Sequence, residues 1–328
     1  MTQATDKPKL LALVGPTAVG KTSISLDIAE RYGCEIISGD SMQVYRGMDI
    51  GTAKISAEER RRIPHHMIDI HDPDYPFSAA EFQEEVKRCI RDIHARGKLP
   101  FLVGGTGLYI ESVCYDYRFV EGGADEAFRE ELRRFAQMEG TAGLYERLKE
   151  VDPATAARLH PNDQRRIIRA LEIAHVTGKP LSAQMEGKPK ESPYRLCIIG
   201  LTMERQLLYK RIDARVDDMI EKGLVEEVRG LMERGITRGM VSMQGLGYKE
   251  IASYLSGECG LEEAVERIKR NTRRFAKRQL SWFRHMKDIV WVDVSDSSKF
   301  SAHFHQINDI IAGKLGIHQE YISKASEH

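Results

Sequence analysis

The feature that most constrains this chain is a phosphate-binding loop pattern close to its N-terminus. An apolar run, residues 10–14, leads directly into GPTAVGKT, which fits the pattern G-x-x-x-x-G-K-[ST], and helical spacing follows. In such a loop, backbone N–H groups and the positive end of a helix converge on an anion, and the lysine adds a full charge. The sequence therefore predicts a strand, a phosphate-binding turn and a helix. The turn consists of Gly15, Pro16, Thr17, Ala18, Val19, Gly20, Lys21 and Thr22.

Strand-like and helix-like segments alternate through the first third of the chain. Apolar runs typical of buried strands occupy residues 10–14, 35–38 and 99–104, and helical spacing occupies 23–31 and 79–96. This order is typical of an α/β fold in which helices flank a parallel sheet. Because ligands bind at the carboxyl ends of the strands in such sheets, the turns after the second and third strands are expected beside the phosphate loop.

The character of the chain changes after this region. Residues 119–193 form short charged segments punctuated by glycines, and they predict a helical insertion domain. Strand patterns return at 195–201 and 290–294, so the α/β core is expected to comprise residues 1–118 and 194–328, with a mainly helical C-terminal part. The helices expected in the insertion are 124–137 and 163–177.

Composition excludes some classes of protein. The 49 Lys and Arg balance the 49 Asp and Glu, so any nucleic-acid surface has to be a local patch. The five cysteines show no C-x-x-C pair and are expected to be reduced thiols. No apolar run reaches the roughly 18 residues of a membrane span, and the N-terminus lacks the pattern of a signal peptide. We therefore expect a cytoplasmic protein without a membrane partner.

An acidic residue follows the second predicted strand. A kinase or an ATP-hydrolysing enzyme is expected to carry an acid that holds magnesium at the end of a sheet strand, but the strand at 99–104 ends in glycines. Asp40, after the strand at 35–38, could instead serve the metal or act as a general base near the phosphate. Asp69 and Asp72 are better explained as loop caps. These residues indicate a phosphate site beside a carboxylate, and they define no reaction.

The most basic stretch of the chain is residues 267–287, which hold nine Lys or Arg and no Asp or Glu. Ile268, Phe275 and Trp282 recur every seven residues, so a helix could bury this stripe and expose its cations. Nine uncompensated cations beside aromatic residues favour binding to a phosphate backbone over a merely solvated face. A second basic turn is formed by Arg165, Arg166 and Arg169.

Two further arginines, Arg211 and Arg215, are four residues apart and share one face of a predicted helix. One of them could reach a pyrophosphate group. The spacing fits equally well a surface pair that neighbouring acids neutralise. Those acids are Asp217, Asp218 and Glu221.

Several motifs occur in the order of a known family. They include GPTAVGKT, DSMQVYRGMDIGTAK, LVGGTGLY, HPNDQRRIIRALE and TRRFAKRQLSWFR. Together they resemble the bacterial tRNA dimethylallyltransferases, also called tRNA isopentenylpyrophosphate transferases. The resemblance implies a P-loop nucleotide-kinase-like parallel sheet with a helical insertion, acting as a monomer with Mg²⁺. It also implies that the loop holds the pyrophosphate of dimethylallyl diphosphate. The dimethylallyl group then moves to N6 of the adenosine 3′ of the anticodon, in the anticodon stem-loop of tRNA.

The resemblance also implies roles for individual residues. Asp40 would take the proton of the adenine amino group, which is a poor nucleophile because its lone pair is conjugated with the ring. Lys21, Arg215 and a magnesium ion at Thr22 would stabilise the departing pyrophosphate, and Thr106 would lie near the adenine. A base stacked in the anticodon loop would have to flip into a channel. The positions that match tRNA contacts are Asp40, Ser41, Met42, Gln43, Thr106, Arg129, Gln164, Arg165, Arg166, Ile167 and Ile168.

Three alternatives stay open at this point. A related enzyme could prenylate free adenine nucleotides, but it would not need the basic stretch at 267–287. A small-molecule kinase would need the missing strand-end acid, and an RNA-binding NTPase would carry out no covalent transfer. The sequence shows no C-terminal zinc-finger spacing, which the eukaryotic relatives carry.

Overall fold

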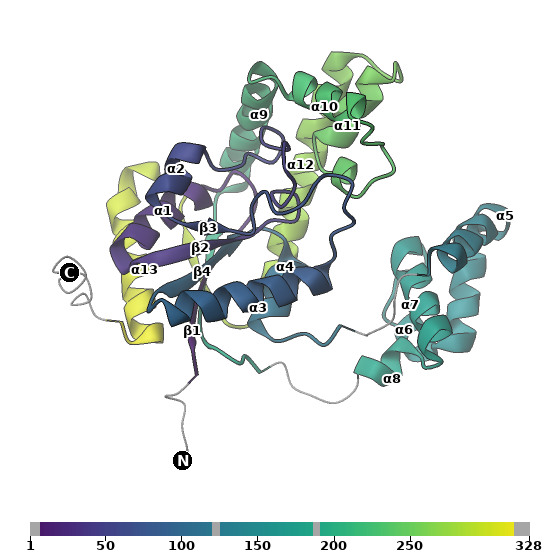
Figure 1. Ribbon diagram of the computed structural model, residues 1–328, viewed down its shortest axis with the longest axis horizontal. Helices are drawn as coiled ribbons and strands as arrows, with labels where there is room; N and C mark the ends of the chain where they lie inside the picture. The colour runs from purple at the N-terminus through teal and green to yellow at the C-terminus, as the bar shows by residue number, and fades with distance from the viewer. Residues whose placement is uncertain (1–6, 120–124, 186–190, 318–328) are drawn as a thin grey trace. The chain divides into compact units, whose positions relative to one another are not determined.

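The computed structural model describes residues 7–119, 125–185 and 191–317, and the chain divides into two compact units (Figure 1). One unit combines Met1–Asp116 with Ser192–His328, and the other consists of Tyr117–Glu191. We call them the α/β unit and the helical unit. Both junctions lie two residues before the positions expected from the sequence.

Six parallel strands form the sheet of the α/β unit, in the order β3-β2-β4-β1-β5-β6. The five strands expected from the sequence are all present, within one residue of their predicted bounds, and the α/β fold class is confirmed. Strand β3 was not predicted, because two residues are too few to show periodicity. The strands are β1 Lys9–Val14, β2 Cys34–Gly39, β3 His65–His66, β4 Leu99–Gly104, β5 Arg195–Thr202 and β6 Ile289–Asp293.

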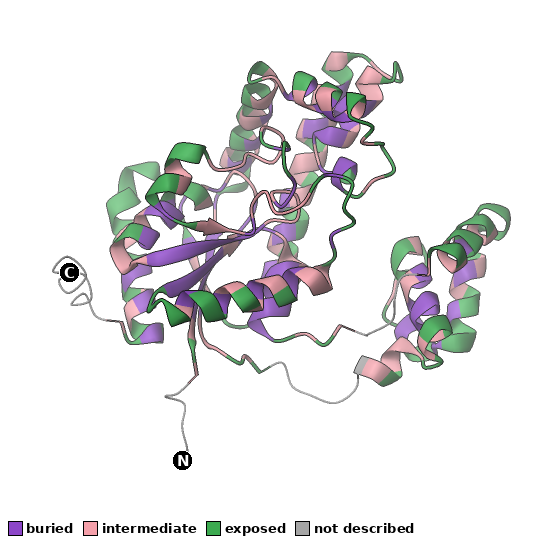
Figure 2. Cartoon of the chain, viewed as in Figure 1, coloured by how far each residue is buried: buried purple, intermediate pink, exposed green. Residues whose placement is uncertain are grey.

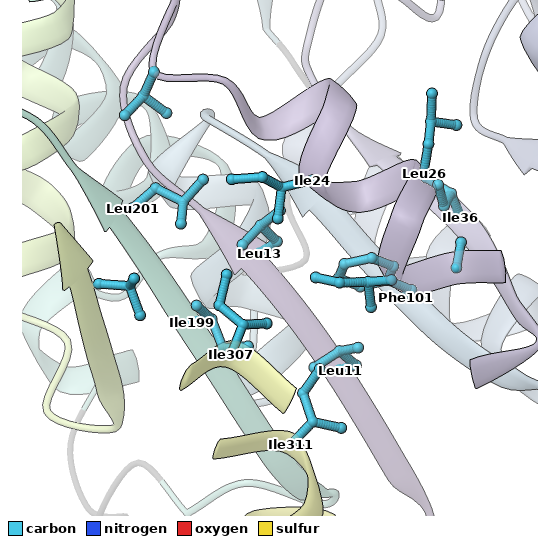
Figure 3. Close-up of a cluster of buried hydrophobic side chains, with 14 of the residues drawn as sticks. Leu11, Leu13, Ile24, Leu26, Ile36, Phe101, Ile199, Leu201, Ile307 and Ile311 are labelled. Atoms are coloured by element: carbon cyan, nitrogen blue, oxygen red, sulfur yellow. The ribbon is translucent and has the colours of Figure 1, made fainter. Parts of the chain in front are cut away.

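The core of the sheet lies along β1, whose residues 10–14 have no exposed surface. Leu11 and Leu13 belong to one apolar cluster with Ile199 of β5 and Ile307 of the C-terminal helix (Figure 3). Figure 2 shows that the strands are buried across the whole unit, whereas the helices are exposed on their outer faces. A strand buried on both faces reads as a continuous apolar run, which explains why β1 is visible in the sequence.

Helices cover the sheet and build the C-terminal part of the α/β unit. One well-packed pair is α3 and α4, in which the rings of Phe82 and Tyr109 stack with centroids 4.2 Å apart. Gln83 Nε2 of α3 also donates to the carbonyl oxygen of Ser112 in α4, at 2.7 Å. The helices are α1 Lys21–Tyr32, α2 Ala57–Arg62, α3 Ala79–Ala95, α4 Gly107–Cys114, α9 Arg205–Glu221, α10 Leu224–Glu233, α11 Tyr248–Leu255, α12 Leu261–Arg284 and α13 Phe300–Leu315.

The helical unit has a core of its own, built around Leu132, Leu144 and Leu148 of α5 and the buried face of α7. Helix α5 is longer than the segment expected at 124–137, and it changes direction at Gly140, where φ is 75°. Its helices are α5 Glu126–Val151, α6 Pro153–Ala156, α7 Gln164–Thr177 and α8 Leu181–Met185. In the described part of both units, no helix is long and apolar enough to cross a membrane.

Candidate functional site

The phosphate loop joins β1 to α1, and its glycines determine its shape. Gly15 and Gly20 have φ values of 151° and 106°, which glycine adopts without strain. A Cβ atom on Gly15 would also lie 2.8 Å from the carbonyl oxygen of Leu201 in β5, so a larger residue would push the loop away from the sheet. Helix α1 begins directly after the loop at Lys21, and its unpaired first N–H groups make that end suitable for an anion.

Lys21 is half-buried at the centre of this loop. Its Nζ atom donates to the carbonyl oxygens of Gly15 at 2.9 Å and Pro16 at 2.7 Å. The pKa of Lys21 is lowered to about 7, chiefly because its ammonium group is removed from water and secondly by the charge of Arg215, while the charge of Asp40 partly opposes the shift. A phosphate group beside the ammonium group would favour the charged form, so the site is arranged to receive an anion.

A cavity of about 370 Å³ opens beside the loop. Its walls come from the loop and α1, from the carboxyl ends of β2 and β4, and from α9 and α12. Ligands bind at this edge of parallel sheets. The cavity brings together several residues that are far apart in the sequence. Among them are Lys21, Thr22, Asp40, Gln43, Arg215 and Gln279.

Asp40 follows β2 and forms part of the cavity wall. Its Oδ1 atom accepts hydrogen bonds from the N–H groups of Met42 at 2.8 Å and Gln43 at 3.3 Å, which fixes the side chain over its own turn. Its Oδ2 atom makes no hydrogen bond within the described residues. One carboxylate oxygen is therefore held by the backbone, and the other is available to a substrate.

Thr106 connects the ends of β2 and β4. Its N–H group donates to the carbonyl oxygen of Gly39, and its hydroxyl oxygen accepts from the N–H group of Ser41, both at 3.3 Å. These contacts place Thr106 against the turn that carries Asp40. The Thr106 side chain itself is not part of the cavity wall.

Arg211 and Arg215 both line the cavity, one helical turn apart on α9. Burial lowers the pKa of Arg215, and the negative charges of Asp40 and Asp218 partly offset the shift. Two of the three acids that could have neutralised the arginines pair elsewhere, Asp217 with Lys269 at 2.7 Å and Asp218 with Lys222 at 2.7 Å. Neither arginine forms an ion pair within the described ranges, so the interpretation as a neutralised surface pair is wrong.

Gln279 of α12 is a site residue that the sequence analysis missed. Its side chain is 6% exposed, and both ends of its amide are used. The Oε1 atom accepts from the N–H group of Thr17 in the phosphate loop at 2.9 Å, and Nε2 donates to the carbonyl oxygen of Gly105 after β4 at 2.9 Å. One side chain thus joins the phosphate loop, the end of β4 and helix α12.

Trp282, one turn further along α12, also contacts the segment that follows β4. Its indole Nε1 donates to Glu111 Oε2 of α4 at 2.9 Å. A Cβ atom on Gly107 would lie 2.4 Å from Trp282 Cδ1, and one on Gly105 would lie 2.2 Å from Gln279 Nε2. Gly105 and Gly107 of LVGGTGLY therefore leave the space that Gln279 and Trp282 of RQLSW occupy. The small residues in one motif and the large ones in the other are a sequence signal that could have indicated contact between the two motifs.

Two expectations about the basic stretch are wrong. The buried face of α12 is formed by Ile268, Ala276 and Phe283, whereas Phe275 and Trp282 are only half-buried, because they face the cavity and α4 rather than the core. Three of the nine cations are neutralised by nearby acids, since Arg267 pairs with Glu263, Lys269 with Asp217 and Arg273 with Asp213. The cations without an ion pair in the described residues are Arg270, Arg274, Lys277, Arg278, Arg284 and Lys287.

The remaining candidate RNA-binding residues lie in the helical unit, and three of them have side chains that are buried or paired within it. Ile167 and Ile168 are buried in the core of that unit, so their side chains stabilise the fold. Arg129 Nε lies 2.7 Å from Oε1 of the fully buried Glu172, which ties α5 to α7. The members of this group that remain accessible are Gln164, Arg165 and Arg166.

The residues around the phosphate loop could bind a magnesium ion that is also coordinated by a bound phosphate group. The described residues contain no group of three or more His, Cys, Asp or Glu side chains that could hold a metal alone. Mg²⁺ commonly takes only one or two protein oxygens and completes its shell with phosphate and water. The hydroxyl of Thr22 and the carboxylate of Asp40 are among the side-chain oxygens that line the cavity.

Fold and cavity together define a class: a P-loop α/β protein that binds a phosphorylated compound next to a positioned carboxylate, without an acid at the end of β4. Comparison with protein families makes the assignment more specific. The family model described as IPP transferase matches residues 43–286, and that of isopentenyl transferase matches residues 8–72. The chain belongs to the IPP transferase family, as the resemblance in its motifs indicated.

Individual relatives cover almost the whole chain. The tRNA dimethylallyltransferase of Geobacillus thermodenitrificans is 52% identical over 307 residues, which are 94% of this chain and 97% of the relative. The crystal structure of the full-length tRNA isopentenylpyrophosphate transferase of Bacillus halodurans matches with a TM-score of 0.72 at 50% identity, covering 98% and 100% of the two chains. A eukaryotic dimethylallyltransferase acting on tRNA matches with a TM-score of 0.80 at 31% identity, covering 94% and 79%.

Proposed function

We propose that this protein transfers the dimethylallyl group of dimethylallyl diphosphate to N6 of the adenosine 3′ of the anticodon in tRNA, and releases pyrophosphate. The names of the relatives support this assignment. The observation that carries it is the position of Asp40, whose unengaged carboxylate oxygen lies in the same cavity as Lys21 and Arg215. A proton acceptor and a cationic site for diphosphate therefore line the same cavity.

The leaving group binds at the phosphate loop. As the allylic C–O bond breaks, both bonding electrons stay on the diphosphate oxygen, and preorganised cations and N–H groups stabilise this charge. Lys21 and Arg215, both half-buried, supply positive charge, and the exposed Arg211 also lines the cavity. A magnesium ion held by Thr22 would add positive charge to the diphosphate.

The nucleophile is activated at Asp40, in the same cavity. The adenine N6 lone pair forms the new N–C bond, and one N6 proton passes to Asp40 as positive charge develops on nitrogen. The backbone bonds to Oδ1 fix the carboxylate, so Oδ2 is the atom that accepts this proton. The base reaches this place only after it leaves the anticodon stack.

The RNA binds through cations that the fold leaves unneutralised. On α12 these are exposed residues such as Arg274 and Arg278, and on α7 it is Arg165, whereas Arg166 pairs with Asp163 at 3.2 Å. Contacts of this kind act on the phosphate backbone, so tRNA affinity should fall steeply with salt. A tRNA substrate also implies a cytoplasmic location, and one chain carries every group that these steps use, so a monomer suffices.

The test offers both acceptors to the purified protein with magnesium and labelled dimethylallyl diphosphate. One acceptor is an unmodified tRNA with adenosine 3′ of its anticodon, and the other is AMP. We expect label in the tRNA alone, and none after magnesium is chelated. Label in AMP alone would assign the protein to the enzymes that prenylate free nucleotides, and label in neither would contradict prenyl transfer.

A further inference from the structure

Helices α9 and α12 are antiparallel neighbours, joined by a ladder of opposite charges. Lys269 Nζ lies 2.7 Å from Asp217 Oδ1, and Arg273 forms an ion pair with Asp213. Each of these rungs lies four residues from the other on both helices, as the helical period requires. The ladder thus has a defined direction, along which the next pair can be read from the sequence.

The series of ion pairs between α9 and α12 does not continue, because α9 carries no acid at the next position. Four residues beyond Arg273 lies Lys277, and four residues before Asp213 lies Tyr209, which carries no charge. One turn further, Arg205 stands where an acid would continue the series. Within the described ranges, neither Lys277 nor Arg205 forms an ion pair. The seam between the two helices therefore changes from neutral to strongly positive over two turns.

A second cavity, of about 490 Å³, opens at this point, and it shares no lining residue with the cavity at the phosphate loop. Its cations are Arg205, Lys277 and Arg284, and no acid lines it. Its apolar wall includes Met203, which is buried, and Leu280, which is half-buried. The volume is in the range of small-molecule sites, so a ligand of nucleotide size is reasonable.

Tyr209 is held in a fixed orientation in this cavity. The guanidinium carbon of Arg205 lies 5.3 Å from the centroid of its ring, and Arg205 Nε donates to its hydroxyl at 3.2 Å. Glu204, the acid closest in sequence, is already used because its carboxylate caps α9 by accepting from the N–H groups of Gln206 and Leu207. Within the described residues, none of the three cations of the cavity forms an ion pair, and no acid lines the cavity.

We propose that this cavity binds a nucleotide, with its phosphate group on Arg205, Lys277 and Arg284 and its base or ribose against Tyr209 and Leu280. Lysine and arginine bind phosphate oxygens through charge-assisted hydrogen bonds, and aromatic rings accept any base by stacking. The nucleotide belongs either to the tRNA, outside the anticodon loop, or to the free nucleotide pool. The tRNA source rests on the proposed function, whereas the free source does not.

The experiment compares two double variants of equal charge. The cavity variant is Lys277→Gln with Arg284→Gln. The control is Arg61→Gln with Arg91→Gln, which removes two exposed cations from α2 and α3 that form no ion pair among the described residues. AMP binding is measured by calorimetry in excess pyrophosphate, which blocks the phosphate loop. The binding of unmodified tRNA is measured across a range of salt concentrations.

Two results support the site and identify its ligand. AMP binding that weakens at least tenfold in the cavity variant, and less than twofold in the control, indicates a free nucleotide. If only tRNA binding weakens, its salt slope should fall by about 1.4 to 1.8 for two lost phosphate contacts, and the control should keep its slope. If the two variants behave alike towards both probes, the proposal is wrong. Binding is measured without prenyl transfer, so failure of the proposed function would be recognised separately.

Discussion

Replacing Gln279 by methionine tests whether α12 shapes the phosphate loop. Methionine has nearly the volume of glutamine, so Gln279→Met removes the two amide hydrogen bonds and leaves no large cavity. Both bonds are 2.9 Å long, and the side chain that makes them is 6% exposed. The variant leaves the N–H group of Thr17 and the carbonyl oxygen of Gly105 without this partner.

The expected magnitude follows from these two groups. Each polar group left without its partner costs about 1 to 3 kcal/mol, and the smaller value applies to Thr17 because water can reach it from the cavity. The free energy of unfolding should therefore fall by about 2 to 4 kcal/mol. If the loop must keep this shape to bind the diphosphate, part of this lost free energy also weakens diphosphate binding. A loss of about 1.4 kcal/mol in binding would raise KM for dimethylallyl diphosphate about tenfold.

The matched control is Gln83→Met, which removes a buried glutamine that donates to Ser112 outside the cavity. Thermal unfolding and steady-state kinetics are measured for both variants. We expect both to lose stability, but only Gln279→Met to raise KM for the diphosphate, with KM for tRNA unchanged. If the two variants lose similar stability and KM for the diphosphate stays at the wild-type value in both, Gln279 only supports the fold and the reasoning is refuted.

Three further predictions follow from the site. Gly107→Ala should lower the free energy of unfolding, measured by denaturant titration, by about 1 to 3 kcal/mol, because the added Cβ would lie 2.4 Å from Trp282. The control is Gly313→Ala in α13, where the added Cβ meets open space, and it should be neutral or stabilising in the same titration. Because the pKa of Lys21 is about 7 without ligand, and the phosphate needs the ammonium form, pyrophosphate affinity should fall up to about tenfold per pH unit above 7. Calorimetry should show no such additional fall in Lys21→Met. Asp40→Asn should lower kcat by about 10² to 10⁴-fold and leave tRNA affinity nearly intact; equal losses in filter binding and turnover would exclude Asp40 as the base.

The sequence revealed those parts of the fold that arise from local patterns. β1 and β4 are buried on both faces and read as apolar runs, and the loop between β1 and α1 carries its own glycine signature. The two-residue strand β3 has no local pattern, because its place depends on pairing with β2. The helix pattern at residues 267–287 was recognised correctly, but its period could not tell which face meets the core.

The site was predicted as far as motifs describe it. Lys21 and Asp40 were identified from the loop and from the end of a strand, and both line the cavity. Gln279 was missed, since a polar residue on a basic helix has no periodic signature and its partners are more than 170 residues away. Ile167 and Ile168 match tRNA-contacting positions of the family, although the helical period turns their side chains into the core.

Nucleoside analysis of tRNA after incubation with the purified protein, magnesium and dimethylallyl diphosphate, together with an assay of released pyrophosphate, tests the proposed transfer and the role of Asp40. We expect N6-dimethylallyladenosine at the position 3′ of the anticodon, one pyrophosphate for each modified nucleoside, and neither product with Asp40→Asn on the same time scale. Pyrophosphate release without a modified nucleoside, or modification at wild-type rate by Asp40→Asn, would contradict this expectation.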